Sequence, residues 1–275
     1  MTATIPTALT EVRQADASPE VRAIYADICT ATGVPQVNLI YRHLATEPPV
    51  LAWVWQTLAP AYRSGTVAAM ADDLSRSVAG DGGPPLWHEL PDEIAGQVEA
   101  VLAFYNRANP QNIIALTALV KAARGRFGAL PPVGGGAAAT TRTAAAWQLP
   151  PLPRRDALDA SRLALIDDLA LRQGGGTGVT PSLYLHLAHW PAAICAAAAR
   201  VAPFLGTADF AARVAAVVAE ADRQADRLAR TLAFGAPPPA AVIEPRLAVV
   251  EHFVAATIPQ MIVVGRILSG APHRT

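Results

Sequence analysis

The amino-acid sequence predicts an all-α protein, and three observations indicate this class. Ala, Leu and Arg, which are strong helix formers, are abundant throughout the chain. Apolar residues recur at helical spacing behind residues that favour a helix start. No stretch shows the sustained alternation of β-branched and polar residues that a half-buried strand needs. Helices packed on helices are therefore expected.

The helices can be placed in order along the chain. Ser18-Pro19-Glu20 supplies an N-cap, a proline at the first helical position and an acidic first turn. Pro91-Asp92-Glu93 opens a second clear helix with apolar residues along one face. Leu158-Asp159 precedes a third, and residues 210–232 form a long amphipathic helix rich in Ala and Arg.

The pair Asn109-Pro110 predicts a break in the second of these helices. A residue that precedes proline is disfavoured in the helical conformation, so Pro110 is expected to begin a new helix. Asn109 is then either a plain N-cap or an amide that points into a ligand cleft beside free backbone N–H groups. The second arrangement suits a carboxylate or a developing anion.

A proline- and glycine-rich segment divides the chain. Residues 129–155 include prolines near both ends and three consecutive glycines, a composition typical of a linker. We expect one helical repeat over residues 1–128 and a second over 156–275. Each half is apolar, and hydrophobic residues make up 52% of the chain, so the two are expected to pack together as a single compact unit.

The two halves match in sequence. Residues 40–60 align without a gap with residues 183–203, which pairs Tyr41 with Tyr184 and His43 with His186. A second landmark, a phenylalanine six residues before a Pro-Gln pair, recurs near the end of each half. These matches predict two pseudo-symmetric repeats, with the ligand cleft between them.

Charge and cysteine content exclude several functional classes. Lys and Arg total 22, and Asp and Glu also total 22, so the chain lacks the basic footprint of a protein that binds nucleic acid or a membrane surface. Cys29 and Cys195 are too few for a disulfide framework or a cysteine zinc site. No secretory signal is evident, and a cytoplasmic protein is expected.

The equivalent histidines His43 and His186 allow two interpretations. They are candidates for an acid/base pair or a metal site if the pseudo-symmetry brings them together. Alternatively, both pack within the same helix-start motif. The second interpretation is favoured, because the chain has no HxxxH or HExxH pattern to complete a metal site.

Several of these segments together resemble the group I α-haloacid dehalogenase family. They are the GVP…RHLATEPP stretch, the FYNRANP segment, the proline-rich linker and a second-half segment that ends in LAHWP. The resemblance covers most of the chain. It implies an all-α, two-repeat hydrolase that cleaves carbon–halogen bonds in small 2-haloalkanoic acids and needs no metal or organic cofactor. The family is often dimeric, so the resemblance allows a homodimer.

The proposed family mechanism uses an aspartate in the second repeat, which activates a water molecule that attacks the chiral carbon directly and inverts it. In this chain the equivalent position is Leu183. Leucine cannot accept a proton, and the nearest replacement base is His186, one helical turn further on. We expect the ring of Tyr184 or His186 to point into the cleft. The residues implied to bind substrate are Gln36, Leu39, Asn109, Ser182, Leu183 and Tyr184.

Two functional hypotheses follow from the residue at position 183. In the first, the protein hydrolyses a small 2-haloalkanoic acid in the cleft between the repeats, with a base other than residue 183. In the second, it is a non-dehalogenating or non-catalytic relative that binds a small organic acid. A titratable group within hydrogen-bond reach of Asn109 or Ser182 would favour the first hypothesis.

Overall fold

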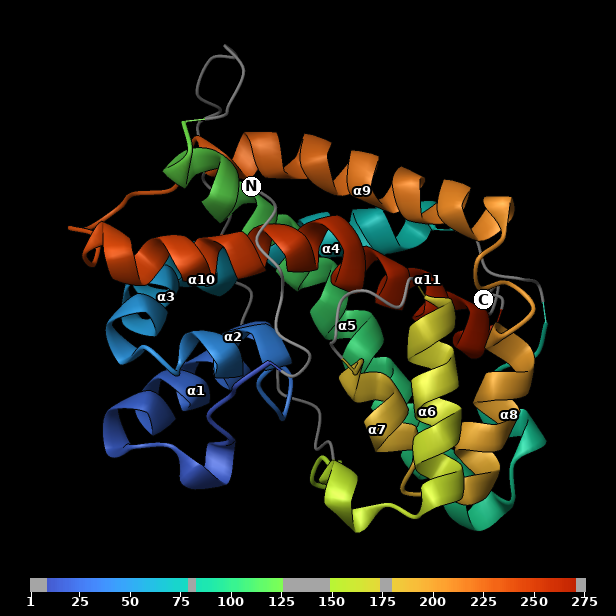
Figure 1. Cartoon of the computed structure of the whole chain (residues 1–275). Helices are drawn as coiled ribbons and strands as arrows, with labels where there is room; N and C mark the ends of the chain where they lie inside the picture. Colours follow the sequence, from blue (N-terminus) through green and yellow to red (C-terminus); the bar gives the residue numbers. More distant parts are fainter. Residues whose placement is uncertain (1–8, 79–82, 126–148, 174–179, 271–275) are drawn as a thin grey trace.

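The described part of the chain is built from helices alone, as the sequence predicts (Figure 1). The computed structural model describes residues 9–78, 83–125, 149–173 and 180–270. Its α-helices are α1 (Pro19–Thr32), α2 (Leu39–Leu44), α3 (Pro48–Arg63), α4 (Thr66–Ser77), α5 (Asp92–Ala123), α6 (Ala160–Arg172), α7 (Ser182–Leu187), α8 (Pro191–Val201), α9 (Ala208–Ala229), α10 (Ala240–His252) and α11 (Ile258–Ser269). Short 3-10 helices occur at Gln14–Asp16, Leu86–Glu89 and Arg155–Ala157, and a π-helix, Phe253–Thr257, joins α10 to α11.

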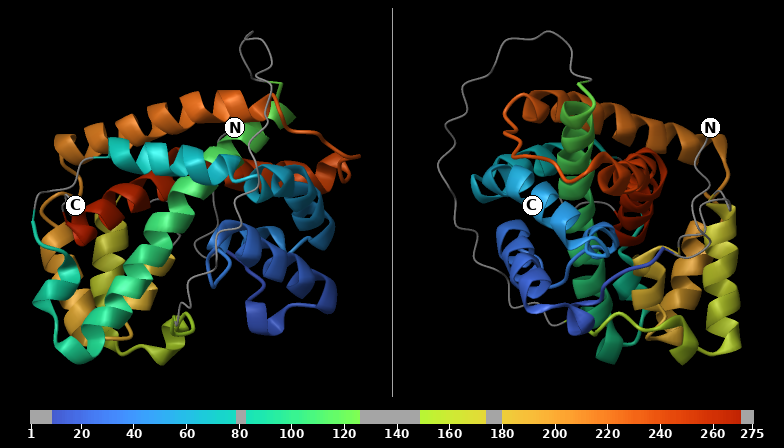
Figure 2. Two further views of the ribbon diagram at one scale, coloured as in Figure 1. Left: turned by 180° about the vertical axis from the view of Figure 1, so that it is seen from behind. Right: turned by 60° about the vertical axis from the view of Figure 1, so that its left-hand side comes forward.

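Helix α5 is the centre around which the other helices pack. It is 32 residues long and lies against α4, α9 and α11 along much of its length (Figures 1 and 2). Residues 108–116 are all buried, whichever way they face. A helix that is buried on all sides belongs to the core, and α5 accordingly carries side chains to several neighbouring helices at once.

The predicted break at Asn109-Pro110 is wrong. Helix α5 continues through both residues, with Pro110 buried inside it. Proline has no N–H to donate to the Asn106 carbonyl, a defect that costs about 3 kcal/mol in a helix interior. Burial of the surrounding helix on every side offsets that cost, so packing decides the path of the chain.

The predicted helix starts are confirmed. The Ser18 hydroxyl accepts a hydrogen bond from the backbone N–H of Val21 at 3.3 Å and caps α1. The Asp159 carboxylate caps α6 in the same way, at 2.9 Å from the backbone nitrogen of Arg162. Helix α9 begins close to its predicted position, with Thr207 as its N-cap.

The matched segments of the two halves have the same local structure. Helices α2 and α7 each have six residues, and each ends before an alanine, Ala45 or Ala188, in nearly the same conformation. A proline begins the following helix in both cases, at Pro48 of α3 and Pro191 of α8. The two-repeat organisation itself stays a prediction, and residues 129–148 of the predicted linker lie outside the described residues.

One apolar stretch is long enough to cross a membrane. The continuous helical segment Ala240–Ser269 meets that criterion by length and composition, and half of its most apolar window is buried within the protein. Its second part, α11, packs against α5, α8 and α9 and is buried over most of its length. The apolar character of this segment is therefore that of a core helix.

Candidate functional site

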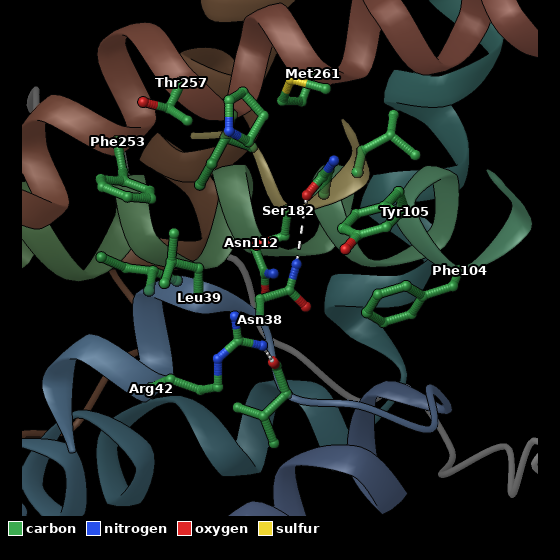
Figure 3. A pocket seen from close by; sticks show the side chains of 16 residues that line it. Asn38, Leu39, Arg42, Phe104, Tyr105, Asn112, Ser182, Phe253, Thr257 and Met261 are labelled. Atoms are coloured by element: carbon green, nitrogen blue, oxygen red, sulfur yellow. Dashed lines mark hydrogen bonds between the residues drawn. The ribbon is translucent and has the colours of Figure 1, made fainter. Parts of the chain in front are cut away.

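Five segments from both halves of the chain enclose a small cavity of about 50 Å³. Its walls come from the start of α2, the middle of α5, the start of α7, the π-helix and α11 (Figure 3). The polar lining residues are Asn38, Arg42, Tyr105, Asn109, Asn112, Ser182 and Thr257. The remaining walls are apolar, formed by Val37, Leu39, Ile40, Phe104, Pro181, Leu183, Phe253, Ile258 and Met261. Mostly apolar walls with a few polar groups are typical of a small-molecule site.

Helix α5 supplies three of the polar groups from one face. Tyr105, Asn109 and Asn112 stand at positions i, i+4 and i+7, which lie above one another on a continuous α-helix. This stripe exists because α5 is not interrupted at Pro110. All three side chains are buried, so they belong to the floor of the cavity.

Arg42 is a buried cation at the cavity wall. The residue is 6% exposed. Its Nε donates to the Glu11 carboxylate at 2.6 Å, and its Nη1 donates to the Val37 carbonyl at 2.7 Å. Its Nη2 is buried without a hydrogen-bond partner. In Figure 3 the guanidinium group points toward Asn38 and Asn112, so an unused charged donor faces the cavity.

The amides around the cavity present further donors. Asn38 donates from Nδ2 to Oδ1 of Asn109 at 3.4 Å. The Tyr62 hydroxyl donates to Oδ1 of Asn112 at 3.1 Å, and it lies 3.2 Å from the Tyr41 hydroxyl. The two α5 asparagines that line the cavity, Asn109 and Asn112, use their oxygen in these contacts, which leaves their amide NH₂ groups to donate. No Asp or Glu is among the described residues that line the cavity.

Tyr105 connects the cavity to His186. The Tyr105 hydroxyl lies 2.8 Å from Nδ1 of His186, and Nε2 of the same ring lies 3.1 Å from the Pro150 carbonyl. A carbonyl only accepts, so Nε2 carries the hydrogen and Nδ1 presents a lone pair to the tyrosine. On the cavity side, the Ser182 hydroxyl lies beside the Tyr105 phenol.

Burial disfavours the charged forms of both His186 and Tyr105 and shifts their pKa values accordingly. It lowers the pKa of His186 to about 4, an effect that the Pro150 carbonyl opposes and that His189 and Arg42 reinforce. Burial also raises the pKa of the Tyr105 phenol well above its usual value of about 10, while Ser182 acts in the opposite direction. At neutral pH the pair is therefore a neutral imidazole that accepts from a neutral phenol.

The structure brings four of the seven predicted site residues to the cavity. Leu39, Asn109, Ser182 and Leu183 line it, and Leu183 is 1% exposed. The other three predicted residues are Gln36, Tyr184 and His186, and none of them is among the lining residues.

The expectation that Tyr184 or His186 points into the cleft needs correction. The Tyr184 hydroxyl is buried without a partner, away from the cavity. His186 lies one turn beyond Leu183 on α7, and Tyr105 fills the space on its cavity side. Gln36 is also directed elsewhere, because its side chain donates to the Pro150 carbonyl at 3.0 Å.

Sequence reasoning did not identify Arg42, Tyr105 or Asn112 as site residues. The predicted break at Pro110 concealed the last two, because their helical spacing from Asn109 matters only if α5 is continuous. Arg42 lies inside the matched RHL segment, but its partner there is Leu185, so the repeat gave it no special weight. A signal was available, since an arginine amid apolar residues is rarely buried without a specific partner.

The π-helix is a second feature that the sequence did not indicate. It spans Phe253–Thr257, and both of its end residues line the cavity. A π-helix adds a residue to a helical turn and is frequent at functional sites. Here the wider turn places Phe253 and Thr257, followed by Ile258 and Met261, along one wall.

The described residues bring together no group of three or more His, Cys, Asp or Glu side chains that could hold a metal ion. The two matched histidines have separate partners. His43 bonds through Nδ1 to the Thr10 carbonyl at 2.8 Å, whereas His186 bonds to Tyr105 and the Pro150 carbonyl.

Solved structures described as D-2-haloacid dehalogenases have a similar arrangement of helices. A D-2-haloacid dehalogenase mutant has a TM-score of 0.76 and 20% sequence identity, over 99% of each chain. The chain has the D-2-haloacid dehalogenase fold. A D-2-haloacid dehalogenase in complex with L-lactate has a TM-score of 0.75 at 20% identity, over 99% of this chain and 100% of that one.

The D-2-haloacid dehalogenase fold is also found in a mutant bound to D-2-chloropropionate, with a TM-score of 0.72 and 20% identity over 95% of this chain and 96% of that one. No family model matches the chain, and no curated protein matches it in sequence. At this identity the likeness establishes the fold, and the chemistry must be argued from the cavity itself.

Proposed function

We propose that this protein binds a short-chain organic acid in the cavity, with the acid's carboxylate on Nη2 of Arg42. The observation that carries the proposal is this buried, unpartnered guanidinium nitrogen at the cavity wall. A buried charged donor without a partner is costly, and an anionic ligand removes that cost. Arginine is well suited to the task because it binds carboxylates with strong, charge-assisted hydrogen bonds.

The rest of the cavity supports an anion of few atoms. The NH₂ groups of Asn109 and Asn112 add neutral donors, and no carboxylate among the described lining residues opposes a negative ligand. A volume of about 50 Å³ limits the ligand to a few heavy atoms. Structures with this fold hold 2-chloropropionate or lactate, which are acids of that size.

A 2-haloalkanoic acid is the substrate class we infer for a reaction in this cavity, by hydrolysis of the carbon–halogen bond. The aspartate that the family resemblance implies as the base is absent, because Leu183 occupies its position and lines the cavity. Binding of a small organic acid is therefore the function that the geometry supports best. Hydrolysis requires a proton acceptor of another kind.

The proposal is tested by comparing an acid with its uncharged analogue. Isothermal titration calorimetry would measure binding of 2-chloropropionate, lactate and the two corresponding amides to the purified chain. We expect both acids to bind, and the amides to bind at least about tenfold more weakly because they lack the charge that pairs with Arg42. Equal affinity for acid and amide, or no binding of either, would overturn the proposal.

A further inference from the structure

The hydrogen-bonded pair of Tyr105 and His186 is not used by acid binding. Tyr105 lines the same cavity as Ser182 and Leu183, and His186 follows these two residues on the short helix α7. Two buried polar side chains from different helices, α5 and α7, meet here at 2.8 Å.

The direction of the hydrogen bonds gives the pair a polarity. The Pro150 carbonyl fixes the hydrogen on Nε2 of His186, so the Nδ1 lone pair must accept from Tyr105. The Tyr105 hydroxyl therefore donates its hydrogen to Nδ1 of His186. On its cavity side the phenol oxygen can accept a hydrogen, and there the Ser182 hydroxyl already lies beside it and a bound water would lie.

We propose that Tyr105 and His186 act together as the proton acceptor for hydrolysis of a 2-halo acid in this cavity. The proposal rests on the proposed function, because Arg42 must hold the acid for water to reach its second carbon. The water oxygen forms a bond to that carbon while the carbon–halogen bond breaks, and the halide leaves with the bonding electrons. The water proton goes to the Tyr105 oxygen as the Tyr105 proton passes to Nδ1 of His186.

The acidities agree with this route. A His186 pKa of about 4 gives the imidazole nearly the basicity of an ordinary aspartate, whose pKa is about 3.9. A free Tyr105 phenolate is disfavoured by burial, so the two protons have to move in one step. The products are a 2-hydroxy acid, a halide ion and a His186 imidazolium. The imidazolium returns its proton to solvent because its pKa of about 4 lies well below neutral pH.

The test measures halide release from both enantiomers of 2-chloropropionate, together with the dissociation constant of the acid by calorimetry. Tyr105→Phe removes the hydroxyl, and His186→Gln keeps an acceptor and a donor but accepts no proton. We expect each substitution to lower kcat by about 100-fold or more, while the dissociation constant changes less than threefold. In wild type, we also expect the rate to fall in D₂O with a curved dependence on deuterium content, which His186→Gln abolishes.

His43→Gln is the matched control. His43 holds the same position in α2 that His186 holds in α7, is 4% exposed and bonds to a backbone carbonyl, but it does not line the cavity or contact Tyr105. It should leave kcat unchanged. If wild type binds the acid but releases no halide, or if Tyr105→Phe or His186→Gln keeps the wild-type kcat, the relay is refuted and acid binding stands. Absence of acid binding refutes the proposed function instead.

Discussion

Replacing Arg42 by methionine removes the buried charge and keeps a side chain of similar length. A hydrogen bond to a charged group contributes about 1.5–3 kcal/mol, so loss of the Nη2 donor should weaken acid binding by about 10- to 150-fold. The substitution has a structural cost as well. The Glu11 carboxylate and the Val37 carbonyl lose the donors that lie 2.6 and 2.7 Å away, and the unliganded protein should melt at a lower temperature.

The two effects separate in a thermal-shift assay with and without ligand. Lactate at 100 times its wild-type dissociation constant should stabilise wild type by about 2.7 kcal/mol. For a protein of this size that is a rise in melting temperature of roughly 5–10 °C. The same concentration should stabilise Arg42→Met by only about 0.3–1.4 kcal/mol, whatever its starting melting temperature.

Glu11→Gln is the control for the lost ion pair. Glutamine still accepts a hydrogen bond from Nε of Arg42, but it removes the negative charge beside the guanidinium. The melting temperature should fall, while lactate should bind as tightly as in wild type or more tightly. A lactate-induced shift in Arg42→Met equal to that of wild type would show that the carboxylate does not bind at this arginine.

Three further predictions follow from the geometry. Leu183→Asp and Leu183→Asn should each lose about 2 kcal/mol or more of stability in urea titrations, because a buried leucine is removed. Only Leu183→Asp should raise halide release from 2-chloropropionate. Equal rates of halide release in the two variants would count against a base at this position. Gly265→Ala should lower the free energy of unfolding by about 1–3 kcal/mol, since the new Cβ would meet the Asn106 side chain. Gly96→Ala, whose Cβ would have nothing within 4 Å, should raise it by about 0.5–1 kcal/mol. Urea titrations that gave the same change for both variants would refute this prediction. Burial lowers the pKa of His186 below its unfolded value of about 6.5, so the unfolded chain binds more protons than the folded one between pH 6.5 and about 4. Through this residue the free energy of unfolding should therefore fall by roughly 2 kcal/mol when the pH is lowered from 7 to 5. An equally steep loss of stability in His186→Gln would contradict the assignment to His186.

The helix content could be predicted because its signals are local. Ser18 and Asp159 cap helices in the structure as their side chains suggest, since an oxygen two or three residues before free N–H groups needs no other part of the fold. Pro110 shows the limit of such reasoning. A proline is a local break signal, but the core around α5 decides its conformation, and local sequence does not contain that core.

The candidate site could be predicted at positions that match the segments of the resembling family. It could not be predicted where the direction of a side chain decides whether the residue reaches the cavity. Asn109, Ser182 and Leu183 line the cavity. His186 has nearly the expected position, but a side chain from α5 lies in front of it, a contact between residues 81 positions apart. The sequence offers a reason to single out Arg42, but it cannot show that Nη2 lacks a hydrogen-bond partner, because that depends on which atoms surround the nitrogen in three dimensions.

The π-helix between α10 and α11 has a consequence for how this cavity can change over evolutionary time. One extra residue in a helical turn rotates everything on one side of it by about 100° relative to the other. Loss of a single codon within residues 253–257 would therefore turn Phe253 and Thr257 away from their present wall, or else turn the buried face of α11 toward solvent. Substitutions can adjust the size of this wall in small steps. Its presence, however, depends on keeping the number of codons between α10 and α11 unchanged.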